Sequence, residues 1–225
     1  MKITKLHRWQ GNIYQAKEIQ KRLALKVLRD GEVVSPKYIA GVDIAITRTS
    51  RIANAAVVVV SYPGLQPVEV ETMQGELEMP YIPGLLSFRE SPLIMAACSK
   101  LKIVPDLMIV DGQGIAHPRK LGIASHIGLM LNLVTIGCAK SRLYGHCMTL
   151  SEEAGSYAEI VDNDEIIGAT LRTKRGVKPL YISIGHKINL KNAIYWVMQC
   201  CREYRLPEPI RLAHVAAGKK LEYKN

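Results

Sequence analysis

The chain has 225 residues, a length that suits one compact domain with a full hydrophobic core, and we expect a single domain over residues 1–225. Hydrophobic residues make up 48% of the sequence and charged residues 22%, without a long Ser-, Gly- or Pro-rich tract, which excludes a largely disordered binding protein. The formal charge of +10, from 30 Lys and Arg against 20 Asp and Glu, favours a polyanionic partner, although a solvated basic helix face would give the same excess.

The first half of the chain predicts one helix and three strands. Apolar residues recur at spacings of three or four between Ile13 and Val27, which predicts an amphipathic helix. Three β-rich runs with short breaks follow and predict an antiparallel meander: YIAGVDIAIT, RIANAAVVVVSY and PVEVETMQGEL. Asp43 falls within the first of these strands.

The second half of the chain resembles the second half of an α/β sheet. Pro80 and Pro83 lack amide donors, so the segment between them is predicted to be a stiff, projecting loop. Further elements are expected in this order: a helix from about Leu85 to Lys100, a buried strand LMIVD ending at Asp111, a glycine-rich turn, a helix from Pro118, strands in LVTIGCAK and LYISIG, and closing helices over Lys191 to Tyr204 and Pro209 to Lys220.

The cysteines and the hydropathy pattern indicate a cytoplasmic protein. The five cysteines are an odd number inside apolar stretches and form no C-x-x-C pair, which fits a reducing compartment. The N-terminus lacks an apolar core of signal-peptide length, and the longest aliphatic run, Ala55 to Val60, is too short to span a bilayer. We therefore expect neither secretion nor a membrane partner.

Two acidic residues lie in apolar strands, where an isolated carboxylate is too costly to keep. Asp43 stands within Ala40–Ala45, and Asp111 ends Leu107–Asp111. Such a carboxylate must be paired, hydrogen-bonded or bound to a metal. A turn-capping role would explain Asp111 before Gly112, but it fits Asp43 in mid-strand poorly. Together the two acids favour a metal site.

Carboxylate oxygens select magnesium or manganese, and these ions serve phosphoryl transfer. Glu90, just after the stiff loop, would make a third ligand. A Glu in the first turn of a helix is also favoured by the helix dipole alone, so its position does not assign it a role.

The turn from Asp111 to Pro118 pairs two glycines with a helix start, where exposed amides bind anions or flat polar ligands. A Lys-Ser/Thr pair does not follow the glycines, which speaks against a nucleotide-binding P-loop. The absence of G-x-S-x-G speaks against a serine-hydrolase elbow.

Several other residues have an ordinary explanation. His214 lies in the apolar run Leu212–Ala217, where a lone His is more often structural than catalytic. Lys140 follows a β-like run and would most simply be solvated. His126 and His186 are equally ambiguous.

Taken together, five motifs resemble endonuclease V, and the resemblance runs from about residue 5 to 220. The two long motifs are highly specific to that family. The motifs are Gly41-Val42-Asp43, Pro80-Tyr81-Ile82-Pro83-Gly84-Leu85-Leu86-Ser87-Phe88-Arg89-Glu90, Asp111-Gly112-Gln113-Gly114-Ile115-Ala116-His117-Pro118-Arg119, Gly122-Ile123-Ala124-Ser125-His126 and Arg211-Leu212-Ala213-His214.

The resemblance implies an α/β, ribonuclease H-like fold, with a central five-stranded mixed sheet of three antiparallel strands followed by two parallel ones, flanked by helices. It implies a DNA repair enzyme that recognises hypoxanthine (deoxyinosine) in DNA and hydrolyses the second phosphodiester bond 3′ to the lesion. The products would carry 3′-hydroxyl and 5′-phosphate ends. The implied cofactor is Mg²⁺, with Mn²⁺ as a substitute, and one or two ions remain open.

The resemblance also assigns roles to residues of this sequence. Asp43, Glu90 and Asp111 would hold metal, and Lys140 and His214 would complete the catalytic set. A wedge entering the duplex would consist of Pro80, Tyr81, Ile82 and Pro83. The pocket for hypoxanthine would be built, largely from backbone groups, by Gly84, Leu86, Gly112, His117, Gly122 and Ile123.

Two alternatives stay open beside a monomeric deoxyinosine endonuclease. An inosine-specific endoribonuclease of the same fold would use the same acids, because no motif encodes sugar preference. A non-catalytic nucleic-acid-binding protein would keep the fold and lose the chemistry, but the intact Asp43, Glu90, Asp111, Lys140 and His214 speak against it.

Overall fold

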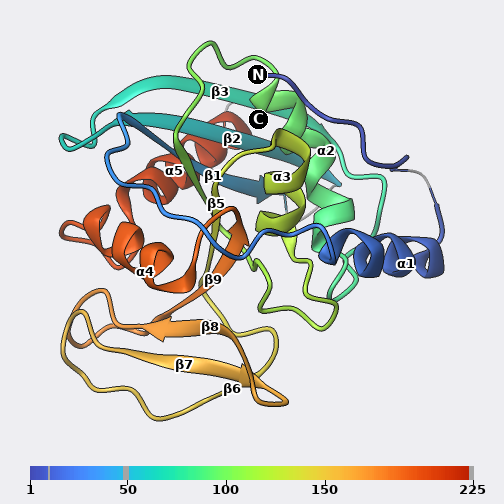
Figure 1. Ribbon diagram of the computed structural model, residues 1–225. Coiled ribbons are helices and arrows are strands. Elements are labelled where there is room, and N and C mark those ends of the chain that lie inside the picture. The colour runs from blue at the N-terminus through green and yellow to red at the C-terminus, as the bar shows by residue number, and fades with distance from the viewer. Residues whose placement is uncertain (10, 48–50, 223–225) are drawn as a thin grey trace.

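One mixed sheet runs through the molecule (Figure 1). The computed structural model describes residues 1–9, 11–47 and 51–222, and within them nine strands pair in the order β3-β2-β1-β4-β5-β9-β8-β7-β6. The strands are β1 (Tyr38–Ile46), β2 (Ile52–Ser61), β3 (Pro67–Glu76), β4 (Leu107–Val110), β5 (Thr135–Ala139), β6 (His146–Cys147), β7 (Tyr157–Asp162), β8 (Glu165–Leu171) and β9 (Leu180–His186).

The first five strands form the mixed sheet that the sequence predicts. β1, β2 and β3 pair as an antiparallel meander, β4 pairs parallel to β1, and β5 pairs parallel to β4. The run Ala53–Val60 is buried throughout, because the sheet is covered on both faces there and needs apolar side chains on each. The expected order of antiparallel and then parallel strands is therefore confirmed.

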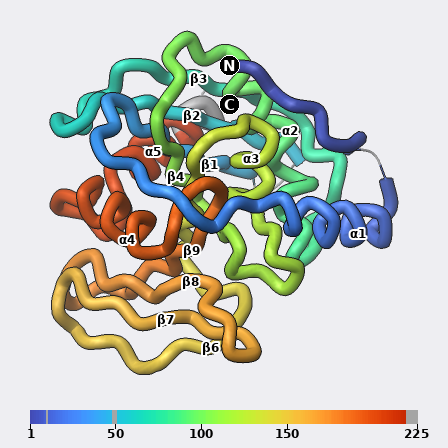
Figure 2. Tube along the Cα trace, viewed as in Figure 1, coloured from blue at the N-terminus to red at the C-terminus, as the bar shows by residue number. Residues whose placement is uncertain are grey.

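The sheet continues antiparallel beyond β5. The predicted strand in LYISIG is β9, which pairs with β5, but β6, β7 and β8 were not expected. Asn163 and Asp164 join β7 to β8 with φ of 46° and 65°, the paired positive angles of a type I′ hairpin turn. Figure 2 shows that this extension lies at one end of the molecule.

Helices cover both faces of the central strands. On one face, Ile94 and Ile127 pack against Val42, while on the other Ile210 and Ala213 belong to the core around Ile39. In the described part of the chain, none of the helices is both long and apolar enough to cross a bilayer. The helices are α1 (Ile13–Ala24), α2 (Leu86–Cys98), α3 (Ile123–Leu131), α4 (Leu190–Gln199) and α5 (Glu208–Glu222).

Two of the predicted helix boundaries are wrong. The helix expected from Pro118 begins only at Ile123, because the preceding residues form turns that Gly122 closes with a hydrogen bond from its amide to the Gly114 carbonyl (2.9 Å). The helix expected over 191–204 ends at Gln199. The first correction matters, because the turn before α3 becomes a wall of the cavity described below.

Candidate active site

Three of the predicted catalytic residues lie at one edge of the sheet. β1, β4 and β5 run parallel, with Val42 opposite Val110 and Val110 opposite Gly137. Asp43 follows Val42, Asp111 follows Val110, and Lys140 directly follows β5. Because the carboxyl ends of parallel strands meet at one edge of a sheet, these side chains are brought together, as in other α/β sites.

Lys140 connects the two aspartates. Its Nζ forms an ion pair with Asp111 Oδ2 and lies 4.0 Å from Asp43 Oδ2. Partial burial lowers the pKa of Lys140, but the charges of Asp111 and Asp43 more than offset this and raise it. The sequence alone left Lys140 as a solvated lysine, whereas the structure gives it a charged role beside two acids.

His214 reaches the same acids from α5. Its Nδ1 donates a hydrogen bond to Asp43 Oδ2 at 2.6 Å, and the side chain is 60% exposed. The interpretation of His214 as a core residue is therefore wrong. Gly41 permits the contact, because a Cβ there would lie 2.0 Å from the Pro209 carbonyl, so a larger residue would push the start of α5 away from β1.

Glu90 lies in α2 and its side chain is 5% exposed. Burial, reinforced by the charges of Asp43 and Asp111 and opposed by Arg89, raises the pKa of Glu90 to about 8. Burial and the neighbouring Asp43, opposed by Lys140, raise the pKa of Asp111 to about 6. The three acids therefore repel one another across a poorly solvated site.

This donor set fits a divalent cation. The acids supply the hard oxygen ligands that Mg²⁺ and Mn²⁺ prefer, and a cation would offset both the burial and the mutual repulsion that raise the pKa values of Glu90 and Asp111. Within the described ranges, no group of three or more His, Cys, Asp and Glu side chains is already arranged to hold a metal ion.

A cavity of about 360 Å³ opens beside the acids, a size typical of small-ligand sites. Asp111 and Lys140 line it, so the cavity and the acidic cluster are continuous. All six residues expected in the base pocket line it as well: Gly84, Leu86, Gly112, His117, Gly122 and Ile123. The sequence interpretation missed Gln20, Ser87, Gln113, Ala139, Ser141, Arg142 and Leu143.

Two helix N-termini point their first residues at this cavity. Leu86 and Ser87 begin α2, and Ile123 begins α3. The first amides of a helix have no acceptor within the helix, and neither N-cap residue, Leu85 or Gly122, has a side chain that can accept from them. The Ala124 amide of α3 already donates to the Gln113 carbonyl at 3.0 Å, so only part of these helix-start N–H groups can serve a ligand oxygen.

The Gly84 carbonyl is held by three side chains behind the cavity. Gln20 Nε2 donates to it at 2.9 Å, His117 Nε2 at 2.9 Å and Arg119 Nη2 at 2.7 Å. His117 Nδ1 accepts from the Arg119 amide, and burial lowers the pKa of His117 to about 4, so the ring is neutral at pH 7. Gly84 has φ of 78°, which suits a glycine.

Gln20 had a readable signal that the sequence interpretation did not use. It stands between Ala16 and Leu23 on the buried stripe of α1, where an apolar residue would be expected. Its Oε1 accepts from Arg119 Nε at 2.6 Å, and its Nε2 also donates to the Leu121 carbonyl at 3.0 Å. Gln20 therefore joins α1 to both loops of the cavity wall.

The predicted wedge is a loop with an exposed tip. Tyr81 is 63% exposed, and Pro80 and Pro83 are also exposed, while Ile82 packs towards Leu85 and Phe88. The Ile82 carbonyl accepts a hydrogen bond from the Leu85 amide at 2.9 Å, which fixes the loop to the start of α2.

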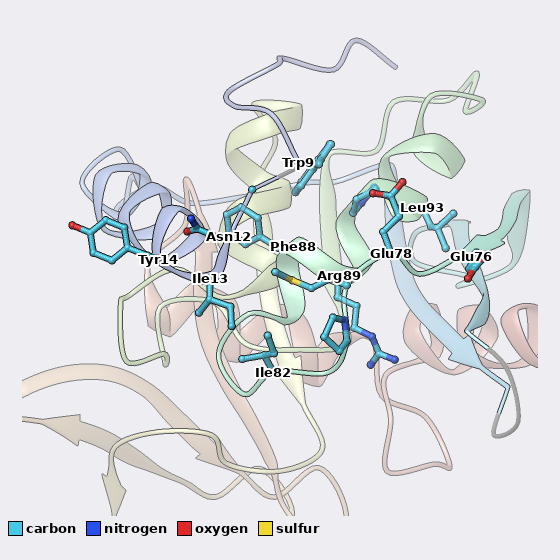
Figure 3. A pocket seen from close by; sticks show the side chains of 14 residues that line it. Trp9, Asn12, Ile13, Tyr14, Glu76, Glu78, Ile82, Phe88, Arg89 and Leu93 are labelled. Carbon is cyan, nitrogen blue, oxygen red and sulfur yellow. The ribbon is translucent and has the colours of Figure 1, made fainter.

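A larger cavity, of about 830 Å³, lies on the other side of this loop (Figure 3). Trp9, Ile13, Glu78 and Phe88 are among its lining residues. Asp111 and Lys140 line the smaller cavity and not this one, so we place the chemistry beside the smaller cavity.

Comparisons with known proteins agree on one family. The sequence model described as Endonuclease V matches residues 17–215. Endonuclease V of Dehalococcoides mccartyi strain BAV1 is 53% identical over 97% of this chain and 98% of its own length. The crystal structure of Bacillus subtilis endonuclease V superposes with a TM-score of 0.94 at 31% identity, covering 99% of this chain and 98% of that one.

A further solved structure contains nucleic acid. Ciona intestinalis endonuclease V, in complex with a 24mer DNA containing an inosine followed by a ribo-adenosine, has a TM-score of 0.83 and 27% identity, over 95% of this chain and 99% of that one. One explanation accounts for the acids at the sheet edge, for the cavity beside them and for these similarities. The chain belongs to the endonuclease V family, whose structures share the ribonuclease H-like fold.

Proposed function

We propose that this chain is a repair endonuclease that recognises deoxyinosine in DNA and hydrolyses the second phosphodiester bond 3′ to it, leaving 3′-hydroxyl and 5′-phosphate ends. The observation that carries the proposal is the shared wall between the acidic cluster and the cavity, formed by Asp111 and Lys140. One domain would thus hold the base and cut the backbone nearby. Its relative from Ciona intestinalis was solved with inosine-containing DNA.

Backbone amides at the helix starts beside the cavity would favour hypoxanthine over adenine. Hypoxanthine presents the acceptor O6 where adenine presents an amino donor. An amide at the start of α2 or α3 would face a donor if adenine entered, and an unsatisfied buried polar group costs about 1–3 kcal/mol. The pocket residues Gly84, Leu86, Gly112, His117, Gly122 and Ile123 would supply this recognition largely through their backbone.

Asp43, Glu90 and Asp111 would hold the Mg²⁺ ion, for which Mn²⁺ would substitute. The bound ion would supply Lewis-acid stabilisation of charge on the phosphate. His214, whose Nδ1 donates to Asp43, keeps Nε2 as the basic nitrogen that accepts a proton from the attacking water. The Lys140 ammonium would stabilise the negative charge that develops on the phosphate oxygens.

Tyr81, with Pro80, Ile82 and Pro83, would enter the duplex and fill the gap left by the flipped nucleotide. Replacing Tyr81 with Ala is expected to weaken binding of a deoxyinosine duplex by about 5- to 150-fold, because base–aromatic stacking contributes roughly 1–3 kcal/mol. The thermal midpoint should hardly change, since the side chain is 63% exposed. Fluorescence anisotropy measures the affinity.

The matched control is Tyr157→Ala, which removes a 55% exposed tyrosine from β7. Tyr81→Phe should retain most of the affinity, because the ring is kept. An affinity of Tyr81→Ala equal to that of the wild type would reduce Tyr81 to a surface tyrosine.

Gln20→Ala is expected to reduce the preference for deoxyinosine by about 5- to 150-fold. The substitution removes one donor from the Gly84 carbonyl and leaves Arg119 Nε without its acceptor, a cost of roughly 1–3 kcal/mol in the wall that orients the base. The readout is the ratio of dissociation constants for deoxyinosine and unmodified duplexes. Gln20→Glu is the matched variant, because it keeps the acceptor for Arg119 Nε but sets a carboxylate oxygen against the Gly84 and Leu121 carbonyls in place of the donors. An unchanged ratio in both variants would show that Gln20 does not position the pocket.

The competing function is cleavage of inosine-containing RNA, which the same acids would support. Parallel assays on matched deoxyinosine and inosine strands decide between them, and faster cutting of the deoxyinosine strand is expected. Faster cutting of RNA would replace the DNA assignment. We further propose that the protein acts as a monomer in the cytoplasm, where its five cysteines stay as the free thiols seen here.

A further inference from the structure

The loop that joins β8 to β9 is strongly basic. Its exposed side chains include Lys174, Arg175 and Lys178, and Gly176 turns the chain with φ of 75°. We call residues 174–178 the basic loop. It was not among the sites expected from the sequence, and none of its residues lines the cavity beside the acids.

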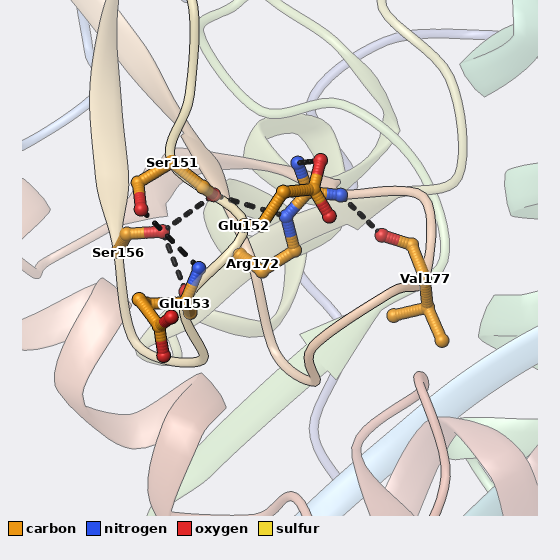
Figure 4. Close-up of polar contacts among 6 residues, drawn as sticks. All are labelled: Ser151, Glu152, Glu153, Ser156, Arg172 and Val177. Carbon is orange, nitrogen blue, oxygen red and sulfur yellow. Dashed lines mark hydrogen bonds and ion pairs between the residues drawn. The ribbon is translucent and has the colours of Figure 1, made fainter.

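The buried Arg172 holds the base of the basic loop (Figure 4). Its Nη1 donates to the Val177 carbonyl, and its Nε donates to the Ser151 carbonyl at 3.2 Å. Its Nη2 pairs with Glu152 Oε1 at 3.1 Å. Arg172 therefore ties Val177, at the far end of the loop, to the loop's base, and ties that base to the neighbouring 151–156 turn.

A second set of contacts ties the basic loop to the catalytic edge. Thr173 Oγ1 donates to the Arg205 carbonyl at 2.7 Å, and Arg205 Nη2 donates to the carbonyls of Lys140 (2.9 Å) and Pro179 (2.7 Å). Lys140 is the residue paired with Asp111. The register agrees, because Tyr181, just after the loop, lies opposite Ala139. Both flanks of the loop, Thr173 and Pro179, are thus linked through Arg205 to the backbone of Lys140.

The positive charges of the basic loop are not neutralised by neighbouring acids. Glu152 is engaged by Arg172, and Lys174 Nζ donates to a backbone carbonyl, that of Glu203, at 2.9 Å. Within the described ranges, no ion pair joins Lys174, Arg175 or Lys178 to a carboxylate. Three such positive charges on an anchored turn are suited to binding a polyanion.

We propose that the basic loop binds the phosphate backbone of the substrate strand or its complement next to the scissile bond. The inference rests on the proposed nucleic-acid substrate and adds the surface that holds the flanking backbone while the cavity holds the base. Lys and Arg contacts to phosphates position a duplex without reading its sequence. The loop therefore contributes affinity to damaged and undamaged DNA alike.

The test compares wild type with the triple variant Lys174→Ala/Arg175→Ala/Lys178→Ala. Affinity for a deoxyinosine duplex and for its unmodified counterpart is measured by anisotropy between low and moderate salt. Each phosphate contact adds about 0.9 to the slope of log affinity against log salt. The triple variant should therefore lose about 1 to 3 from that slope on both duplexes, with an unchanged ratio of the two affinities.

The matched control removes three exposed lysines at the opposite end of β1 and β4, in Lys37→Ala/Lys100→Ala/Lys102→Ala. Its slope should stay near that of the wild type. A triple variant with the wild-type slope, or a control that loses as much, would overturn the proposal. Wild-type cutting of the deoxyinosine duplex, assayed in parallel, tests the proposed function separately, so that each failure is recognisable by itself.

Discussion

Replacing Asp43 with Ala is expected to slow cutting of a deoxyinosine duplex by roughly 1000-fold or more, equivalent to about 4 kcal/mol of transition-state stabilisation. Asp43 is the centre of the site, because it accepts from His214 at 2.6 Å and lies 4.0 Å from Lys140 Nζ. Its loss would remove a proposed metal ligand and the hydrogen-bond partner of His214. Single-turnover cleavage of labelled duplex in Mg²⁺ measures the effect.

Binding should survive this substitution, since Asp43 does not line the base cavity. Asp30→Ala is the matched control, because it removes an exposed aspartate that lines neither cavity. If Asp43→Ala cut the duplex as fast as the wild type, the proposed role of the acids in cutting would be wrong.

Replacing Glu90 with Gln is expected to abolish cutting while stabilising the metal-free protein at alkaline pH. The pKa of Glu90 rises from 4.5 to about 8 on folding, chiefly through burial. Between these pH values the folded protein keeps a proton that the unfolded chain releases, so the free energy of unfolding falls as pH rises. At about 1.4 kcal/mol per pKa unit, the loss is on the order of 5 kcal/mol by pH 9.

Urea unfolding in EDTA from pH 5 to pH 9 measures this difference. The advantage of Glu90→Gln over wild type should grow across that range and shrink when Mg²⁺ is added, because the ion binds only the wild-type acid cluster well. Glu18→Gln, at an exposed position on α1, should show no such trend. If the difference in unfolding free energy between wild type and Glu90→Gln did not change with pH, the raised pKa of Glu90 would be contradicted.

The sequence alone predicted the part of the site that lies on strands, namely Asp43 and Asp111. Asp43 stood out because a carboxylate in an apolar strand needs a partner, and the parallel register of β1 and β4 brings Asp111 beside it. The antiparallel meander of β1, β2 and β3 was likewise readable from the apolar runs and their breaks, whereas the full five-stranded order came from the family resemblance. Such features depend on local pattern, which a single sequence contains.

The helix-borne part of the site depended on the family resemblance. Glu90 and His214 reach the acids only through the packing of α2 and α5, which no local pattern specifies. Gly41 allows α5 to approach β1 closely. Its contact with Pro209 joins residues 168 positions apart in the sequence, so a local pattern does not reveal it. Gln20 carried a signal, a polar residue on the buried stripe of α1, but its partners on two distant loops were not readable from the sequence.

The hairpin of β7 and β8 was missed although its turn was visible. Asn163 and Asp164 are favoured residues for the observed positive φ angles, but β7 has mixed burial, so its alternation was weak. The anchoring of the basic loop by Arg172 likewise follows from the hairpin and was beyond sequence reasoning.

The central claim is that this site cuts beside deaminated adenine with a divalent metal. The direct measurement is cleavage of an end-labelled duplex with one deoxyinosine, in Mg²⁺ and in EDTA, against the same duplex with deoxyadenosine. We predict a single nick at the second phosphodiester bond 3′ to deoxyinosine, in Mg²⁺ only. Equal cutting of the deoxyadenosine duplex, cutting in EDTA, or a nick elsewhere would contradict the account.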